Sequence, residues 1–295
     1  MEDRIGFVIL HYGDVRVTDR CIQSICRLSG SEDTLIVVVD NEVSRNRAER
    51  EENRKHFETA GNIHVLLSFG KGGFSEANNL GYAYAREQGC RFILVLNNDI
   101  EFDRKDFLVR LKEIWREKAC HVLAPDVVRA GTGEHQNPLD TRIRTAKEAE
   151  RTIRLNRAAL AVFPLVYPVL DRWEQREEKR QTLQRLQTGS DSASASDLED
   201  IVPFGACLIF TPAFVTAEKK AFEPETRFFY EEYILALRCR KKGYLIRYVP
   251  ELHVLHESGA ATGHTYHTSA AKLRFRLERT GEAAEVYLRY LQSGE

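Results

Sequence analysis

The sequence has no excess of charge of either sign. Its 295 residues include 43 Lys and Arg against 44 Asp and Glu, which gives a formal net charge of −1. Proteins that bind along a nucleic-acid backbone need a surplus of basic residues to neutralise phosphates. The balance therefore argues against a nucleic-acid partner.

Long apolar runs are also missing. No unbroken stretch reaches the roughly 18 apolar residues that a transmembrane helix needs, and the opening MEDRIGFVIL does not resemble the apolar core of a secretory signal. We therefore expect a cytoplasmic protein.

Cysteine is present without metal-site or redox spacing. No CxxC pair occurs, which argues against a zinc ribbon or a thioredoxin-type site. Most of the cysteines lie in apolar stretches, so we expect reduced thiols in the core. The six cysteines are at positions 21, 26, 90, 120, 207 and 239.

Strand and helix patterns alternate over the first 130 residues. Short apolar runs at 5–10 and 35–39 are typical of strands buried on both faces, and 63–67 and 91–96 are predicted to be two further strands. This order predicts an α/β fold with a mostly parallel central sheet flanked by helices. Ligands in such sheets bind beyond the carboxyl ends of the strands.

Polar residues follow two of these strands. Asp40 and Asn41 could contact a nucleobase or ribose, and Asn98 and Asp99 could hold a divalent cation that neutralises a diphosphate. Either pair could instead form an Asx turn that only ends the strand. The residues alone leave both interpretations open.

A glycine turn leads into the third helix. Gly73, Phe74 and Asn78 belong to a stretch in which backbone N–H groups could approach a phosphate at a helix N-terminus. The stretch matches neither a Walker A loop nor GxGxxG. A tight turn without a ligand is the alternative.

The C-terminal third carries two further candidates. Glu231 and Glu232 follow the aromatic residues 228–230, where apolar surroundings could raise a carboxyl pKa and suit a general base. They could equally be solvated acids at a helix start. His256 ends an apolar strand and could contact a metal or phosphate, or be purely structural.

Secondary structure in this third is expected to be simple. Segments 201–210 and 244–256 are strand-like, with a turn at Pro250, and 270–291 is an amphipathic helix broken near Gly281.

In order and spacing, these segments resemble the family 2 glycosyltransferases, which have the GT-A fold. The likeness covers residues 5–127 and 201–259 and is greatest to bacterial rhamnosyltransferase-like members that build surface polysaccharides. The segments that carry it are HYGDVRVTDRCIQSI, VVVDN, GGFSEANNLGYAYA, LNND, FGACLIF and FFYEEYILALRCRKKGYLIRYVPELHVLH.

The resemblance implies inverting sugar transfer from a nucleotide-diphospho-sugar to a glycan or lipid-linked acceptor. Asp99, with His256, would hold Mg²⁺ or Mn²⁺, and Glu232 would be the base, with Glu231 as the second candidate. The residues that would meet the donor are His11, Tyr12, Asp40, Asn41, Gly73, Phe74, Asn78 and Asn98.

Several residues depart from the family pattern. His11 stands where Asn is usual, and Asn-Asn-Asp supplies one carboxylate where two are common. Tyr233 and Ile234 occupy positions where a further acid is often found, which keeps a non-catalytic sugar-nucleotide-binding or scaffold protein as an alternative. A nucleotidyltransferase is a second alternative, but the loop after the first strand lacks the expected Gly-rich basic character.

The middle of the chain has a different composition. Residues 142–157 are rich in arginine and precede a charge-free run at 158–170 that contains two prolines. This pattern suits peripheral contact with the inner face of a membrane; the alternative is a helical insert that packs on the core or forms a homodimer.

We therefore expect four parts. Residues 1–130 form the nucleotide-sugar half of a GT-A domain, 131–200 a helical or mobile insert, 201–260 the acceptor and catalytic half, and 261–295 a helical tail.

Overall fold

A computed structural model describes most of the chain. The described residues are 3–42, 45–58, 62–69, 73–169, 172, 176, 180, 198–257 and 268–293. The strands are β1 (Ile5–His11), β2 (Leu35–Asp40), β3 (Ile63–Leu67), β4 (Phe92–Asn97), β5 (Ile100–Glu101), β6 (Val122–Arg129), β7 (Glu134–His135), β8 (Leu198–Glu199), β9 (Cys207–Phe210) and β10 (Ile246–His256). The helices are α1 (Val15–Cys26), α2 (Arg47–Phe57), α3 (Phe74–Glu87), α4 (Phe107–Glu117), α5 (Ala146–Ala161), α7 (Pro212–Ala217), α8 (Glu231–Lys242) and α10 (Ser269–Gln292).

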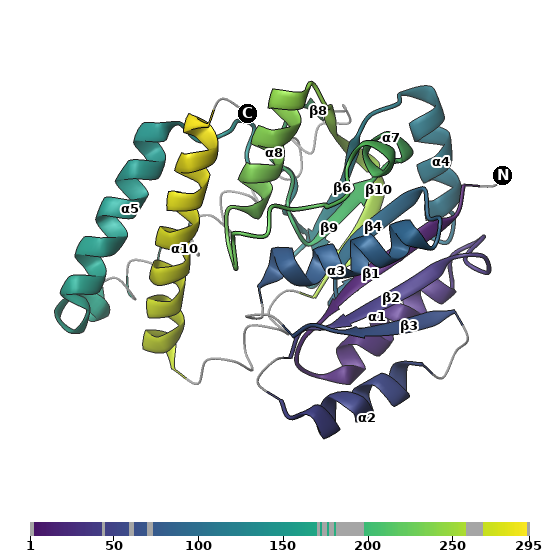
Figure 1. Cartoon of the computed structure of the whole chain (residues 1–295), viewed down its shortest axis with the longest axis horizontal. Coiled ribbons are helices and arrows are strands. Elements are labelled where there is room, and N and C mark those ends of the chain that lie inside the picture. The colour runs from purple at the N-terminus through teal and green to yellow at the C-terminus, as the bar shows by residue number, and fades with distance from the viewer. Residues whose placement is uncertain are drawn as a thin grey trace.

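One mixed sheet forms the centre of the molecule (Figure 1). Its strand order is β3-β2-β1-β4-β9-β6-β10-β5, with β7 beside β6 and β8 beside β10. The longer pairings, among β3, β2, β1 and β4 and between β6 and β10, are parallel, whereas β9 is antiparallel to both of its neighbours. The predicted α/β fold with a mostly parallel sheet is confirmed.

The two faces of the sheet each bury a separate apolar layer. Side chains alternate along the strands, so that Val8 faces α3, α8 and α10 while Phe7 and Ile9 face α1 and α4. Gly81 on α3 lets this helix lie close to β1, since a Cβ there would come within 2.3 Å of the Val8 side chain. The helices thereby fix the carboxyl edge of the sheet, where the candidate site lies.

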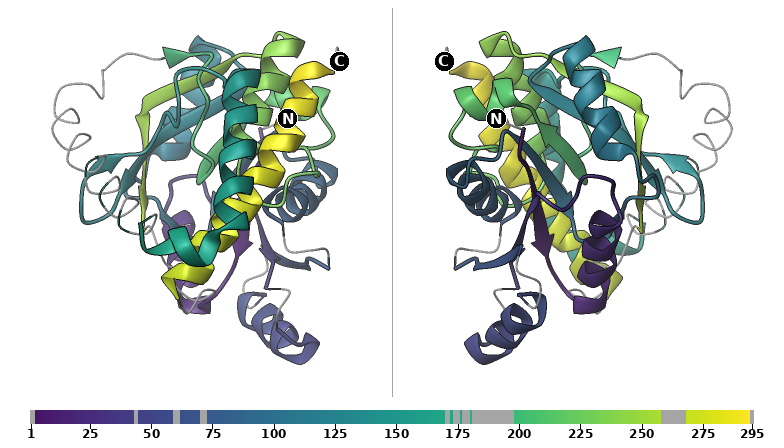
Figure 2. Two further views of the ribbon diagram at one scale, coloured as in Figure 1. Left: turned by 90° about the vertical axis from the view of Figure 1, so that its left-hand side faces the viewer. Right: turned by 90° about the vertical axis from the view of Figure 1, so that its right-hand side faces the viewer.

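Helices α5 and α10 lie side by side as a pair at one end of the molecule (Figures 1 and 2). Arg157 of α5 forms an ion pair with Glu285 of α10, and Asn156 donates a hydrogen bond to the Leu277 carbonyl oxygen. Gly281 lies within α10 without interrupting it, so the expected break there is wrong. Contacts with α5 and with the α8 face stabilise the helix through this residue.

Two other expectations need adjustment. The segment around Pro250 is not a turn between two strands: β10 continues through it with a register shift between Val249 and His253. Parts of the insert, including most of 171–197, and the glycine turn at 70–72 lie outside the described residues. The four-part division of the chain stays a prediction.

Candidate functional site

His11, at the end of β1, is fully buried and does not face solvent. Its Nδ1 lies 2.7 Å from the Thr18 hydroxyl and its Nε2 lies 3.5 Å from the Asn53 amide nitrogen. Burial lowers the pKa of His11 to about 4, so the ring is neutral at physiological pH. His11 therefore braces the end of β1 against α1 and α2, and its contact with a donor stays a prediction.

Asp40 anchors the carboxyl end of β2. Its Oδ1 accepts hydrogen bonds from the Glu42 backbone N–H at 2.9 Å and from Arg50 Nε at 3.2 Å. The Glu42 contact is the Asx turn that the sequence left open. Arg50 Nη2 also donates to the carbonyl oxygens of Asp40 and Ser68, at 2.6 and 2.8 Å. Asp40 Oδ2 is buried and has no hydrogen-bond partner among the described residues, so it is an unused acceptor.

Asn41 and Asn98 connect neighbouring strand ends. The Asn41 backbone N–H donates to the His11 carbonyl oxygen at 3.0 Å. The Asn98 side chain donates to the Tyr12 carbonyl oxygen and to the Thr18 hydroxyl, both at 3.0 Å. These bonds fix the loop after β1, on which Tyr12 is half-buried.

Asp99 and His256 meet at the same edge although they are far apart in the sequence. Antiparallel pairing of β5 with β10 brings them together, and His256 Nε2 lies 3.3 Å from Asp99 Oδ1. His256 Nδ1 lies 2.6 Å from the Gln136 amide oxygen, which is an acceptor, so Nδ1 carries the proton. Nε2 of His256 faces the Asp99 carboxylate.

A carboxylate oxygen and an imidazole nitrogen that face each other are a suitable pair of ligands for a divalent cation. The orientation of His256 by a second residue, Gln136, is also usual for a metal-binding imidazole. Among the described residues, no group of three or more His, Cys, Asp or Glu side chains is placed to hold a metal. Asp99 and His256 could therefore supply two ligands to a cation.

Glu231 and Glu232 begin α8, directly after two residues with left-handed backbone. Phe229 and Tyr230 have φ values of 72° and 66°. Such a conformation costs a non-glycine residue about 1–3 kcal/mol and is concentrated at functional sites. It turns the chain so that both carboxyl groups enter the protein.

Burial raises the pKa of both glutamates. The pKa of Glu231 lies well above its usual range because the carboxyl group is desolvated and because Glu232 is next to it. Desolvation also raises the pKa of Glu232, opposed by hydrogen bonds from the backbone of Glu232 and Gly205. Glu231 is buried and its Oε1 has no hydrogen-bond partner within the described part of the chain, whereas Glu232 is half-buried. Glu232 is therefore the more exposed of the two residues.

Phe204 and Gly205 connect these glutamates to the Asp99–His256 pair. The Phe204 ring packs against the His256 ring with 5.8 Å between centroids. A Cβ on the next residue, Gly205, would lie only 2.4 Å from Glu232 Oε1. The carboxyl group of Glu232 therefore lies against the backbone of the segment that contacts His256, which links the two residues.

The start of α3 is joined to the loop before α8. The Phe74 backbone N–H donates to the Arg227 carbonyl oxygen at 2.6 Å, and a Cβ on Gly73 would lie 3.0 Å from Arg227 Cα. Gly73 thus permits close approach of two chain segments, and its contact with a phosphate stays a prediction. Phe74 packs on Phe222.

Asn78, also on α3, is fully buried. Neither its amide oxygen nor its amide nitrogen has a hydrogen-bond partner among the described residues. Its assigned contact with a donor is untested.

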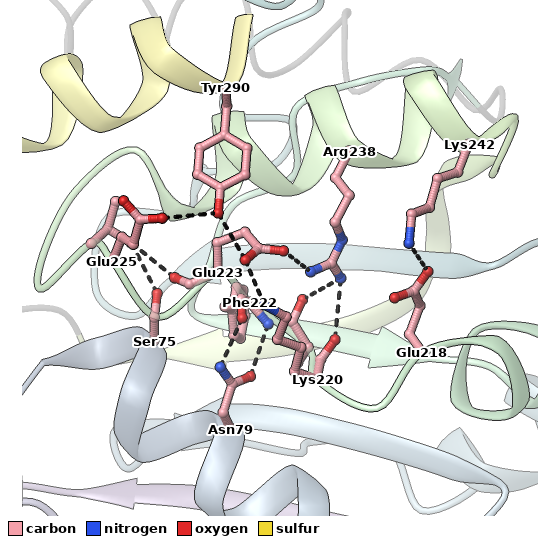
Figure 3. Close-up of polar contacts among 12 residues, drawn as sticks. Ser75, Asn79, Glu218, Lys220, Phe222, Glu223, Glu225, Arg238, Lys242 and Tyr290 are labelled. Carbon is pink, nitrogen blue, oxygen red and sulfur yellow. Dashed lines mark hydrogen bonds and ion pairs between the residues drawn. The ribbon is translucent and has the colours of Figure 1, made fainter. Parts of the chain in front are cut away.

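Several polar contacts hold the 218–227 loop in place (Figure 3). Asn79 binds both backbone groups of Phe222, donating at 2.7 Å and accepting at 2.9 Å. Arg238 of α8 forms a buried ion pair with Glu223 at 3.1 Å, and Tyr290 of α10 donates to the same carboxylate at 2.9 Å. Helices α3, α8 and α10 therefore converge on the loop that leads to Glu231.

The family is decided by a comparison with known protein families. The model for glycosyl transferase family 2 matches residues 7–183, which is more than half of the chain. The chain belongs to glycosyl transferase family 2. The matched range includes Asp40 and Asp99 but ends before Glu232 and His256, so the roles of the last two depend on the geometry above. A comparison of the sequence with curated proteins finds no match.

Solved structures support the GT-A fold. The crystal structure of S. aureus TarS 1-349 is similar with a TM-score of 0.50 and 11% identity, over 86% of this chain and 60% of that one. The crystal structure of GalNAc-T7 with UDP, GalNAc and Mn²⁺ is similar with a TM-score of 0.53 and 12% identity, over 86% of this chain and 43% of that one. This family 2 chain thus spans less than two thirds of either structure.

Three supporting residues of the site were not identified from the sequence. Arg50 lies in a charged helix where its neighbours look alike, and Gln136 lies in a connection with no recognisable motif. Gly205 was part of a quoted segment, FGACLIF, but only its distance to Glu232 shows why glycine is needed there.

Proposed function

We propose that this protein is an inverting glycosyltransferase that moves a sugar from a nucleotide-diphospho-sugar to a hydroxyl group of a glycan or lipid-linked acceptor. The observation that carries the proposal is the single site in which Glu232 and the Asp99–His256 pair are joined through Phe204 and Gly205. Family membership supports glycosyl transfer as the reaction class.

Glu232 would act as the general base. The acceptor hydroxyl oxygen attacks the anomeric carbon from the face opposite the nucleotide, while its proton passes to the Glu232 carboxylate. The bond from the anomeric carbon to the diphosphate oxygen breaks, and the electron pair leaves with the diphosphate. Attack from the opposite face inverts the configuration at that carbon.

Asp99 and His256 would hold Mg²⁺ or Mn²⁺ in this reaction. A bound cation supplies positive charge against the diphosphate leaving group. Gln136 would orient the His256 ring for this purpose through its contact with Nδ1. Asp40 and the loop of Tyr12, which Asn98 fixes, would position the nucleotide at the neighbouring strand ends.

A donor screen tests the proposal. Purified protein is incubated with UDP-, GDP- and dTDP-sugars, with and without Mn²⁺, and both the melting temperature and the release of nucleoside diphosphate are measured. We expect one donor class to raise the melting temperature by ligand linkage and to be consumed. Binding without any consumption, even with candidate acceptors, would instead support the non-catalytic alternative. Transfer of a nucleotidyl group to a sugar phosphate would support the nucleotidyltransferase.

The metal assignment has its own readout. Asp99→Asn and His256→Gln should each remove most of the Mn²⁺-dependent rise in melting temperature with nucleoside diphosphate. Loss of a metal ligand or of its support commonly weakens metal binding by about 10- to 100-fold. The matched control is Asp103→Asn. Asp103 is an exposed acid that contacts His253, which lies on β10 as His256 does. An unchanged Mn²⁺ effect in both site variants would contradict the assignment.

We also propose that residues 131–200 contact a membrane peripherally, where a lipid-linked acceptor would lie. In the helical segment after α5, Leu165 is 81% exposed and Val169 is 68% exposed. Leu155 on the outer face of α5 is also exposed, as are the basic residues Arg151 and Arg154. An apolar tip next to basic residues suits the interface of an anionic bilayer. No described helix is both long enough and apolar enough to cross one.

Vesicle flotation tests this contact. We expect the wild type to float with phosphatidylglycerol vesicles and less with phosphatidylcholine, and Leu165→Glu with Val169→Glu to abolish flotation. Val109→Glu, an exposed apolar position on α4, is the control. Equal flotation of the double variant would contradict the proposal. A dimer of the wild type that the double variant dissociates, without flotation, would support the homodimer instead.

A further inference from the structure

Arg144 occupies an unusual position between two tyrosines. It lies between β7 and α5, and its Cζ is 4.9 Å from the ring centroid of Tyr230 and 4.6 Å from that of Tyr233. Arg144 Nη1 also donates a hydrogen bond to the Tyr230 hydroxyl at 2.6 Å. A guanidinium group combines planar stacking with directed hydrogen bonds, which a lysine cannot do.

A second set of contacts fixes Arg144, Tyr230 and Tyr233. These contacts come from Tyr287 of α10 and from Asp140. The Tyr287 hydroxyl donates to the Arg144 carbonyl oxygen at 2.6 Å, and the Tyr287 ring lies 5.4 Å from the Tyr230 ring. Tyr233 donates to Asp140 Oδ2 at 3.1 Å. The backbone and side chain of Arg144 are therefore fixed independently.

The residues that Arg144 contacts flank the two glutamates. Tyr230 is the left-handed residue directly before Glu231, and Tyr233 directly follows Glu232. A strained backbone persists only when its surroundings stabilise it. The contacts of Arg144 with Tyr230 and Tyr233 therefore stabilise the first turn of α8 immediately before and after the two glutamates.

We propose that Arg144 is a positioning residue for the proposed reaction: through Tyr230 and Tyr233 it holds the left-handed turn that directs Glu232 towards the acceptor. Arg144 does not touch the substrate in this role. The inference rests on the proposed function, because it concerns the placement of the base. It also gives the 131–200 insert a part in catalysis that is separate from any membrane contact.

Two variants of Arg144 and a matched control test the proposal. Arg144→Gln removes the charge and the stacking, and Arg144→Lys keeps only the charge. Arg142→Gln is the control, because Arg142 is an exposed arginine two residues away whose ion pair is with Glu148. If Arg144→Gln does not fold, Tyr287→Phe replaces it, because it removes only the hydroxyl that donates to the Arg144 carbonyl oxygen.

Two measurements are made on each variant. Hydrogen–deuterium exchange of the peptide covering 228–236 reports the turn itself and needs no donor. We expect exchange there to be at least about tenfold faster in Arg144→Gln than in the control. With the donor found in the screen, we expect kcat to fall at least about tenfold with donor KM changed less than twofold, since the nucleotide binds at other strand ends. Arg144→Lys should lie between the wild type and Arg144→Gln.

The outcomes separate this inference from the proposed function. Unchanged exchange in Arg144→Gln overturns the inference whether or not the protein is active. Faster exchange with an unchanged kcat also overturns it, because the contact is then only structural. If the wild type consumes no donor, the proposed function fails, and faster exchange in Arg144→Gln still supports Arg144 as the residue that holds the turn.

Discussion

At the ends of β1, β2 and β4, the candidate polar residues follow regular parallel strands directly. Glu231 and Glu232 instead follow a left-handed turn that does not belong to the sheet. Asp40 is bonded to the Glu42 backbone and to Arg50 of α2, next to its own strand. Asn98 is bonded to groups that follow the neighbouring strand β1. The loop and turn that precede the glutamates are held by side chains from α3, α10 and the segment before α5. The difference teaches that the strand ends, which we propose as the donor edge, are ordered by neighbouring elements of the sheet. The start of α8, which we propose as the catalytic edge, is positioned by distant parts of the chain.

The largest expected effect is on the catalytic edge alone. Glu232→Gln should lower kcat by about 10²- to 10⁴-fold, since it removes the proton acceptor. The melting-temperature shift produced by a nucleoside diphosphate with Mn²⁺ should remain, because the donor edge is unchanged. Glu231→Gln is the paired variant, and a larger loss there than in Glu232→Gln would reverse the assignment of the base.

Gly205→Ala tests the catalytic edge without removing any functional group. The new Cβ would lie 2.4 Å from Glu232 Oε1, so the carboxyl group has to move. Displacement of a catalytic group by about 1 Å can cost roughly 100-fold in rate, so we expect a loss of that order in kcat with nucleotide binding retained. Gly281→Ala is the control, since its nearest neighbour, Asn156 Cβ, would be 3.7 Å away. Wild-type kcat in Gly205→Ala would show that the Glu232 position is not critical.

Gly81→Ala acts on the parallel half of the sheet and should affect stability. Its Cβ would lie 2.3 Å from Val8 Cγ1 and 2.8 Å from Val39 Cγ2, in a packed core. We expect a loss of about 1–3 kcal/mol in the free energy of unfolding, measured by urea denaturation. Gly281→Ala should instead stabilise α10 by up to about 1 kcal/mol. Equal stability of the two variants would contradict the close packing of α3 on β1 and β2.

The smallest effect concerns pH and Glu231. Burial raises the pKa of Glu231 in the folded state, so the unfolded state loses its proton first as pH rises above the ordinary range of a glutamate. The wild type therefore loses stability as pH rises until the raised pKa is passed. Glu231→Gln should raise the melting temperature at pH 7.5 by a few degrees, about 2–4 °C per kcal/mol, and by less at pH 4. A difference that does not grow with pH would contradict the raised pKa.

The parallel half could be predicted closely from the sequence. The continuous apolar run at 35–39 is sufficient to place β2, because a strand buried on both faces excludes polar residues. The shorter run at 63–67 places β3, although this strand contains His64 and is buried only in part. Asp40 and Asp99 could be selected as the polar residues that end such runs. Arg50 could not, since its burial beside Asp40 depends on how α2 packs.

For the C-terminal third, the sequence predicted which residues belong to the candidate site better than it predicted how they are arranged. Glu231, Glu232 and His256 could be selected from the resemblance, but the contact of His256 with Asp99 requires β5 to pair with β10. The continuous α10 was not anticipated, because the local preference of Gly281 against helix is outweighed by the packing of α10 on α5 and α8.

The sequence by itself determined the strands, the order of the candidate residues and the family resemblance, because apolar periodicity and short motifs are local properties. Only the tertiary structure decided that Phe204 and Gly205 join Glu232 to His256, that Gln136 orients His256, and that Arg144 lies between Tyr230 and Tyr233. These are contacts between segments more than 25 residues apart, and burial, which raises the pKa values of the two glutamates, exists only once those segments have packed together.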